Sequence, residues 1–467
     1  MAKKIGQKYS YFTLFLLLIS ASTLKAQFLN SDSAFKAGTP GSGRIWGYAF
    51  GDYYYKSHSD SLNRGGSNQY SGIQQGRNTF QFRRIYLGYD YNISKKFSAE
   101  LLLAAEDNFP AYNPPTSNAS SGDLTSNGKE TFFIKLANVR WKDIWKGTDL
   151  VVGEQATPSF AMMSEKVWNY RSVERTIADI RRTPSYDLGA GLQGTFDPKT
   201  KNFGYNLLVA TGNSDKPSNN SFKWFSGDVW GMFLDRRLIV DFYADYERLN
   251  WDPTWHHDRQ MIKGFISYNT PIFTIGVEGY INNIRQDTKA LLNHYRSATD
   301  SVDLINTNAR GISVFAHGDI LPSKLRWFAR VDTYNPNHNI NNGMYSYYAP
   351  VSSPSGYGAG SYKIVYGSNG NATSAAPYVN GNTPDTHVLG GVNGKTTGVG
   401  DITSKELFAT AGLDFTPIRN VHFEPNVWYN HYSSQLPTGK FGNYDMVYRM
   451  TFLFIFGKTY KNTHNQF

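Results

Sequence analysis

The connections in this chain alternate between short and long. About sixteen stretches of alternating apolar and polar residues run along it. Short turns rich in Asp, Asn, Pro and Gly lie near residues 92–94, 143–147, 197–201, 235–236, 269–271, 318–322 and 416–419. The long polar segments are residues 57–77, 107–129, 157–185, 212–224, 250–258, 285–308, 335–404 and 433–443. A closed outer-membrane barrel has tight periplasmic turns and longer outer loops. The alternation therefore predicts an all-β, transmembrane antiparallel β-barrel of about 16 strands.

The two faces of these stretches differ in polarity. In residues 237–247, Val240 and Phe242 lie on an apolar face. Asp241 and Asp245 lie on the opposite face. A charge at every second position is costly against lipid, so the polar face must line water. A soluble sandwich is the alternative, but its strands are usually five or six residues long, and those predicted here run about ten to thirteen.

The N-terminus resembles an export signal. Lys3, Lys4 and Lys8 precede an apolar run of about eleven residues, which suits a signal peptide and is too short to span a bilayer. Ala26 precedes the expected cleavage site, with Gln27 as the first mature residue. The predicted organisation is a signal peptide (1–26), a periplasmic lead-in (27–43), a transmembrane barrel (44–456) and a polar tail (457–467).

Composition narrows the function classes. The chain contains no cysteine, which removes disulfides, thiolate metal sites and cysteine nucleophiles. The formal charge is +10. It becomes about +6 once four lysines leave with the signal, and this is far from a nucleic-acid-binding composition.

Two stretches lose the period of two, and one loop is unusually long. The phase slips at residues 83–84 and again near residues 137–138, and a β-bulge would explain each slip. Residues 335–404 form a connection rich in Gly, Asn, Ser and Tyr that could hold a further hairpin near residues 361–367. If that hairpin entered the wall, the strand count would become 18.

The third long connection, residues 157–185, mixes apolar side chains with cations. Trp168 and Tyr170 lie among several arginines, and Ser164 followed by Glu165 resembles a helix start. Because such a segment is too apolar to extend freely into water, we expect an inward-folded third extracellular loop. An external lid or a contact with a neighbouring subunit is the alternative.

Residues 82–91 (FRRIYLGYDY) and 179–192 (DIRRTPSYDLGAGL), together with the arginine-bearing third loop, resemble the porins of the phosphate-selective O/P type. The resemblance extends to the Bacteroidetes branch of that family and covers nearly the whole mature chain. It implies a sixteen-stranded barrel, often trimeric, that passes small solutes.

The resemblance also implies a constriction lined with cations. The loop positions that could correspond are Lys166, Arg171, Arg175, Arg181 and Arg182. The lumen-wall candidates are Arg84, Lys135, Arg326, Arg330 and Arg449. Acidic residues would face the same lumen, namely Glu100, Asp241, Asp245, Glu278, Asp332 and Glu424. The expected selectivity is therefore a weak anion preference rather than strict phosphate specificity.

Motifs of other chemistries are weak. Residues 390–396 (GGVNGKT) lack the first glycine of a phosphate-binding loop and its strand–loop–helix context. His256, His257 and Asp258 lie together and could hold a metal ion. Adjacent histidines on a strand point to opposite faces, which makes a shared ion awkward, so we expect solvated loop residues. No G-x-S-x-G element occurs. We expect no enzyme activity, no cofactor and no metal.

The sequence thus predicts a porin in the cell outer membrane that gives passive diffusion of small polar solutes and ions. Its expected partners are outer-membrane lipid, lipopolysaccharide and further copies in a homotrimer, with no nucleic acid. The alternative is a barrel that acts as an interaction or assembly partner in an envelope complex.

Overall fold

The computed structural model describes most of the predicted barrel. The described residues are 39–60, 70, 73, 75–106, 132–159, 163–181, 184–214, 216, 218, 220–251, 255–292, 302–341, 344–350, 362–366, 372–379, 383–384, 404–433 and 443–457. The predicted signal peptide, most of the predicted lead-in and all but the first residue of the predicted tail lie outside them.

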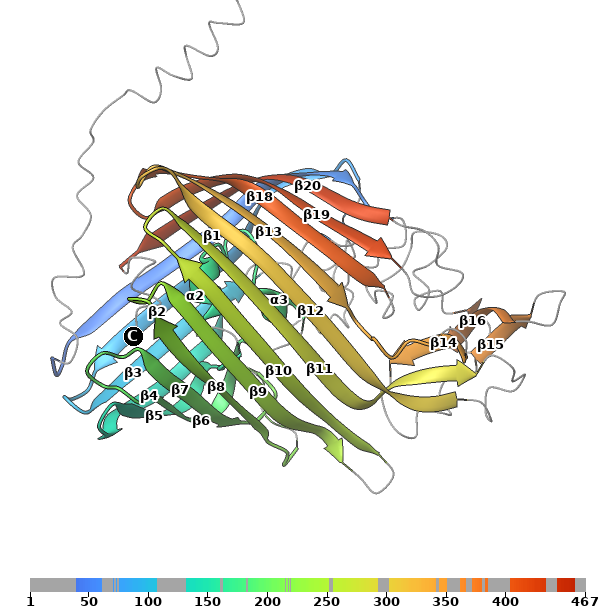
Figure 1. Ribbon diagram of the computed structural model, residues 1–467, viewed down its shortest axis with the longest axis horizontal. Helices are drawn as coiled ribbons and strands as arrows, with labels where there is room; N and C mark the ends of the chain where they lie inside the picture. The colour runs from blue at the N-terminus through green and yellow to red at the C-terminus, as the bar shows by residue number, and fades with distance from the viewer. Residues whose placement is uncertain are drawn as a thin grey trace, which may run out of the picture.

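Sixteen strands form one closed antiparallel barrel, as predicted. They are β1 (Gly43–His58), β2 (Asn78–Asn92), β3 (Phe97–Glu106), β4 (Phe133–Trp145), β5 (Thr148–Ala156), β6 (Tyr186–Thr195), β7 (Phe203–Ala210), β8 (Trp224–Phe233), β9 (Leu238–Trp251), β10 (His256–Asn269), β11 (Phe273–Leu292), β12 (Val302–Leu321), β13 (Leu325–Asn335), β18 (Lys405–Ile418), β19 (Val421–Ser433) and β20 (Asn443–Phe456). Each strand pairs with the next, and pairing of β1 with β20 closes the ring (Figure 1).

The alternation of side chains along β9 shows how the wall is built. Val240 and Phe242 are exposed on the outside, whereas Asp241, Tyr243 and Asp245 are buried on the inside. The outer surface of the other strands likewise carries many exposed large apolar residues. This is the arrangement of a wall that faces hydrocarbon outside and polar groups inside.

The short and long connections lie at opposite ends of the strands, but two predicted loops are shorter than expected. β11 and β12 continue as a hairpin to Leu292 and Val302, so the predicted 285–308 loop is mostly strand. His256, His257 and Asp258 are not loop residues, since they begin β10 and pair with β9. Cross-strand hydrogen bonds at both sites outweigh the polar composition that suggested loops.

The long connection after β13 adds no strand to the barrel wall. β14 (Tyr345–Pro350) pairs with the far end of β11. β15 (Tyr362–Tyr366), β16 (Ala372–Val379) and β17 (Thr383–Pro384) form a separate three-stranded sheet. The hairpin near residues 361–367 therefore exists, but it lies beyond the barrel and the count stays at sixteen (Figure 1).

Two β-bulges explain the phase slips. Phe50 pairs with Arg84 and Gly51 with Phe82, so Arg83 is the extra residue of the first bulge. In the second bulge the extra residue is Lys135, two positions before the predicted slip. A bulge lets consecutive residues point to the same side, and Arg83 and Arg84 are both buried on the lumen side.

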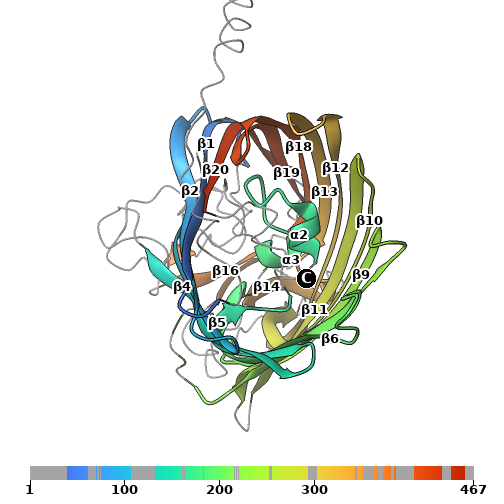
Figure 2. The ribbon, with the colours of Figure 1, turned by 90° about the vertical axis from the view of Figure 1, so that its left-hand side faces the viewer.

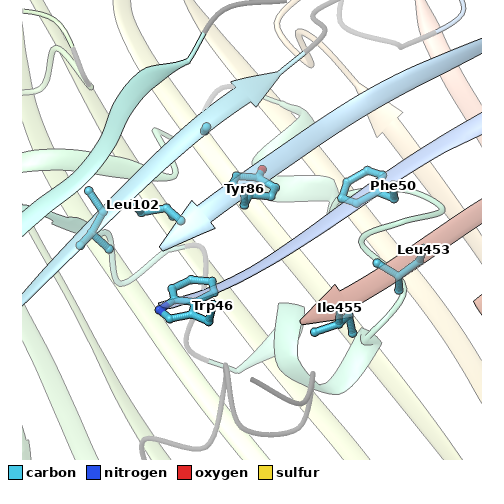
Figure 3. Packing of buried hydrophobic residues seen from close by; sticks show 8 residues of the cluster. Trp46, Phe50, Tyr86, Leu102, Leu453 and Ile455 are labelled. Atoms are coloured by element: carbon cyan, nitrogen blue, oxygen red, sulfur yellow. The ribbon is translucent and has the colours of Figure 1, made fainter. Parts of the chain in front are cut away.

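The third loop (residues 157–185) lies inside the ring, as predicted. Its two short helices, α2 (Ser164–Trp168) and α3 (Ile177–Ile180), are surrounded by strands in the view along the barrel (Figure 2). Neither is long enough to cross a membrane. On the inner face of β1, β2, β3 and β20 a separate apolar cluster includes Trp46, Phe50, Tyr86, Leu102 and Leu453 (Figure 3).

Candidate pore constriction

Aromatic packing fixes the first half of the third loop against the wall. The Trp168 ring is fully buried, with its centroid 5.2 Å from that of Phe315 and 6.3 Å from that of Phe328. Tyr170 lies 4.5 Å from Phe328 by the same measure. Full burial of one large apolar side chain contributes about 1.5–3 kcal/mol. The loop is therefore a packed part of the interior.

A glycine in the wall makes room for the second half of the loop. A Cβ atom on Gly311 would lie 2.9 Å from Cδ1 of Ile177 and 2.4 Å from Cε1 of Tyr280. Real Cβ atoms do not approach so closely, so a side chain at this position would force the side chains of Tyr280 and Ile177 to shift.

Wall arginines hold the tip of the loop by its backbone. Arg83 donates to the carbonyl of Ser172, Arg449 to that of Val173 at 3.1 Å, and Arg330 to that of Arg175 at 2.5 Å. Hydrogen bonds from a charged donor are about twice as strong as neutral ones. Arg330 and Arg449 were predicted to line the lumen; they face it, but their guanidinium groups hold the loop.

Next to Arg83, the wall carries a compact ionic group. Glu106 on β3 accepts a hydrogen bond from Lys135 at 2.6 Å and lies 3.2 Å from Arg84. The Tyr86 hydroxyl donates to the same carboxylate at 2.5 Å. Two of the predicted wall cations, Arg84 and Lys135, thus share one carboxylate.

The loop cations also have acidic partners. Arg171 lies 2.8 Å from Asp179 and 3.2 Å from Glu165. Burial would raise the pKa of Asp179, but the nearby guanidinium groups of Arg171 and Arg175 outweigh it and lower that pKa. Arg181 contacts both oxygens of Glu406 on β18, at 2.9 and 2.6 Å.

Arg175 is less tightly paired. The Arg175 side chain keeps 18% of its surface exposed, and Nε is 4.0 Å from Glu174. Burial lowers its pKa, opposed by Asp179. Burial also lowers the pKa of Lys166 to about 7, opposed by Asp228 on β8. The remaining loop candidate, Arg182, lies outside the described residues.

The charges of the candidate constriction nearly balance. Among the described residues, four cations form ion pairs with four carboxylates. The cations are Arg84, Lys135, Arg171 and Arg175, and the carboxylates are Glu106, Glu165, Glu174 and Asp179. Formal charges of these eight groups cancel. Arg326, the last wall candidate, lies elsewhere, 2.7 Å from Asp319 and hydrogen-bonded to His317.

Sequence reasoning did not find a contribution from the first outer loop. Tyr70 of that loop is fully buried inside the barrel and donates to Asp52 on β1 at 2.6 Å. Lys56 donates to the Tyr70 carbonyl, and Arg449 to the Tyr70 hydroxyl at 3.3 Å. Arg449 thus connects the first loop with the third. The isolated tyrosine carries no periodic signal that would have placed it there.

Comparison with known proteins identifies the architecture. No family model and no curated protein matches the chain. Among solved structures, the outer membrane channel DcaP of Acinetobacter baumannii matches with a TM-score of 0.52 and 10% identity over 91% of this chain and 99% of that one. OprB of Pseudomonas putida matches with a TM-score of 0.49 and 9% identity over 89% of this chain and 93% of that one. OmpT of Vibrio cholerae in its trimer form matches with a TM-score of 0.45 and 8% identity over 90% of this chain and 100% of that one. At such identities the likeness is one of fold, so the chain shares the closed-barrel architecture of DcaP.

Proposed function

We propose that this protein is an outer-membrane porin through which small polar solutes and ions diffuse passively. The observation that carries the proposal is the third loop, which packs inside a closed barrel (Figure 2) and brings the charge of Arg171 near Glu106 and its partners. The exposed apolar exterior suits lipid, and the polar interior suits water. Such a channel works without a cofactor, because the walls need only filter by size and charge.

We further propose a weak anion preference, with phosphate among the anions that pass. The supporting observation is that Arg175, a partly exposed cation of the candidate constriction, has no carboxylate oxygen closer than 4.0 Å among its described ion pairs. The other three cations of the constriction are closely paired. A single partly compensated charge biases the local concentration of ions without excluding cations.

Conductance measurements in planar bilayers test both the channel function and the anion preference. The purified protein should give stable conductance steps, and a salt gradient should give a reversal potential on the anion side. Arg175→Gln should move that potential toward the cation side. Arg236→Gln is the matched control, because it removes the same charge from an exposed turn between β8 and β9. A silent barrel would refute the channel, and an unchanged potential in Arg175→Gln would refute the assigned residue.

One observation favours the second candidate function, a barrel that binds a partner protein. β11 and β12 are 20 residues each, whereas about ten residues are enough to cross a bilayer. Their outer ends, with β14, form a sheet that projects beyond the barrel (Figure 1). Deleting residues 345–384 should abolish capture of such a partner while leaving conductance unchanged. The predicted homotrimer and contacts with lipopolysaccharide stay predictions.

A further inference from the structure

We propose that Asp414, His422 and Glu424 form a binding site for a first-row divalent cation, of which Zn²⁺ is the probe. The three residues lie on β18 and β19, on either side of the short turn that joins these strands. They belong neither to the loop cations nor to the wall cations that the sequence predicted for the constriction.

The three donor atoms are close enough to share one ion. One ligand atom from each residue lies within 4.8 Å of the other two. Nδ1 of His422 and Oδ1 of Asp414 are 2.9 Å apart. With bonds of about 2.0–2.2 Å, ligand atoms of one ion lie about 3–4 Å apart. Small side-chain rotations therefore bring all three into the range of one coordination sphere.

The environment of Glu424 is a second, independent observation that points to a bound cation. Its side chain is 1% exposed, and Oε2 has no hydrogen-bond partner among the described residues. A carboxyl oxygen buried without a partner either keeps its group protonated or, when ionised, costs several kcal/mol. A cation coordinated by this oxygen removes that cost, because it supplies the missing positive charge.

The surrounding cations are already engaged. Arg83, the nearest cation on β2, lies 2.5 Å from Asp52. Arg326 on β13 lies 2.7 Å from Asp319. Asp414 is 3% exposed, and its described partners are His422 and the hydroxyl of Thr416. Two carboxylates therefore share one imidazole, which is the mixed oxygen and nitrogen set that suits zinc.

The site has an open side and a link to the loop. The His422 side chain keeps 22% of its surface exposed, so water can complete the coordination. Oε1 of Glu424 accepts a hydrogen bond from the Ser172 hydroxyl at 2.9 Å. Ser172 lies in the tip of the third loop, beside the carbonyl contacts made by Arg83 and Arg449. Bound metal would thus hold the carboxylate that contacts the loop.

Calorimetric titration of the purified barrel in detergent with Zn²⁺ tests the site. Wild type should bind one more equivalent per chain than His422→Gln or Glu424→Gln, or bind that equivalent at least tenfold more tightly. His257→Gln is the matched control, because His257 also lies beside a carboxylate, Asp287 at 3.1 Å. His257→Gln should bind as wild type does. Equal binding by wild type and both site variants would overturn the proposal.

A second measurement needs no variant. Crystals of the wild-type protein soaked in Zn²⁺ should give an anomalous difference peak between the three side chains. Absence of that peak at saturating Zn²⁺ would overturn the site even if the variants failed to fold. Binding does not depend on the proposed channel function, since a silent barrel could still bind Zn²⁺. In a conducting barrel, Zn²⁺ should shift the reversal potential toward anions, because it neutralises two carboxylates.

Discussion

The ion pair between Arg181 and Glu406 gives the sharpest test of how the third loop is held. The two side chains are 6% and 7% exposed, and both guanidinium nitrogens contact the carboxylate. Asn430 donates to the same carboxylate at 2.6 Å. Glu406→Gln keeps the shape of the side chain and an oxygen for Asn430, but it leaves the charge of Arg181 buried without a counterion.

The expected cost follows from burial. Removing one partner of a buried pair costs about 3–5 kcal/mol. The lower end applies here, because the amide oxygen still accepts hydrogen bonds. About 3 kcal/mol corresponds to a local-opening population on the order of 10²-fold larger. The sixteen strands should stay closed, since no strand pairing is changed.

Limited trypsin digestion followed by mass spectrometry measures the open population. Cleavage after Arg175 should accelerate on the order of 10²-fold, provided that the loop opens and closes faster than it is cut. Asp319→Asn is the control, because the Asp319–Arg326 pair is 25% and 29% exposed. A pair so exposed is worth at most about 1 kcal/mol, so its loss should change the rate less than about fivefold.

A double variant separates charge from packing. Arg181→Met combined with Glu406→Gln removes the unbalanced charge and should return the cleavage rate most of the way to that of wild type. If Glu406→Gln were cut no faster than the control, the pair would not hold the loop. If the double variant were cut as fast as the single one, buried charge would not be the cause.

Three further results are expected. Trp168→Ala should cost the inward loop about 3–5 kcal/mol and increase conductance noise in bilayers without changing barrel melting. Raising the pH from 6 to 8.5 should weaken the anion preference, because the pKa of Lys166 is lowered to about 7, and Lys166→Met should lack this change. The pKa of Lys166 lies below its usual 10.5, so protonation of this lysine opposes the folded loop. The resistance of the loop to trypsin should therefore rise as the pH is raised from 6 to 8.5. Tyr70→Phe should loosen the first loop by about 1 kcal/mol, seen as faster hydrogen exchange of its amides.

The barrel was predictable because its signal is repeated in most strands. Most strands show the period of two, and the short turns use residues suited to tight reversals. The errors lie where one strand departs from the others. Nothing in residues 285–308 marks the continuation of β11 and β12, since the pairing of Thr288 with Ile305 depends on a partner strand rather than on local composition.

The site was predictable in composition but not in pairing. The sequence identifies cations in the third loop and on the wall, and it identifies carboxylates that face the same lumen. It cannot show that Arg181 meets Glu406, because 225 positions separate them. The sequence places a bulge at residues 83–84, but only the pairing with β1 shows that Arg83 is the extra residue and shares the inner face with Arg84.

The ion pairs that the structure adds to the predicted composition change the role of the arginines. Cations that line a lumen attract anions only in so far as their charge is uncompensated. Arg83 and Arg330 each have a carboxylate 2.5 Å away and donate to the loop backbone, so their main effect is to fix the loop. In the proposed channel, the position of the loop sets the width available to a solute, and charge selectivity comes from Arg175 and, below its pKa, from Lys166. Neutralising Arg330 should therefore alter conductance more than selectivity, whereas neutralising Arg175 should do the reverse.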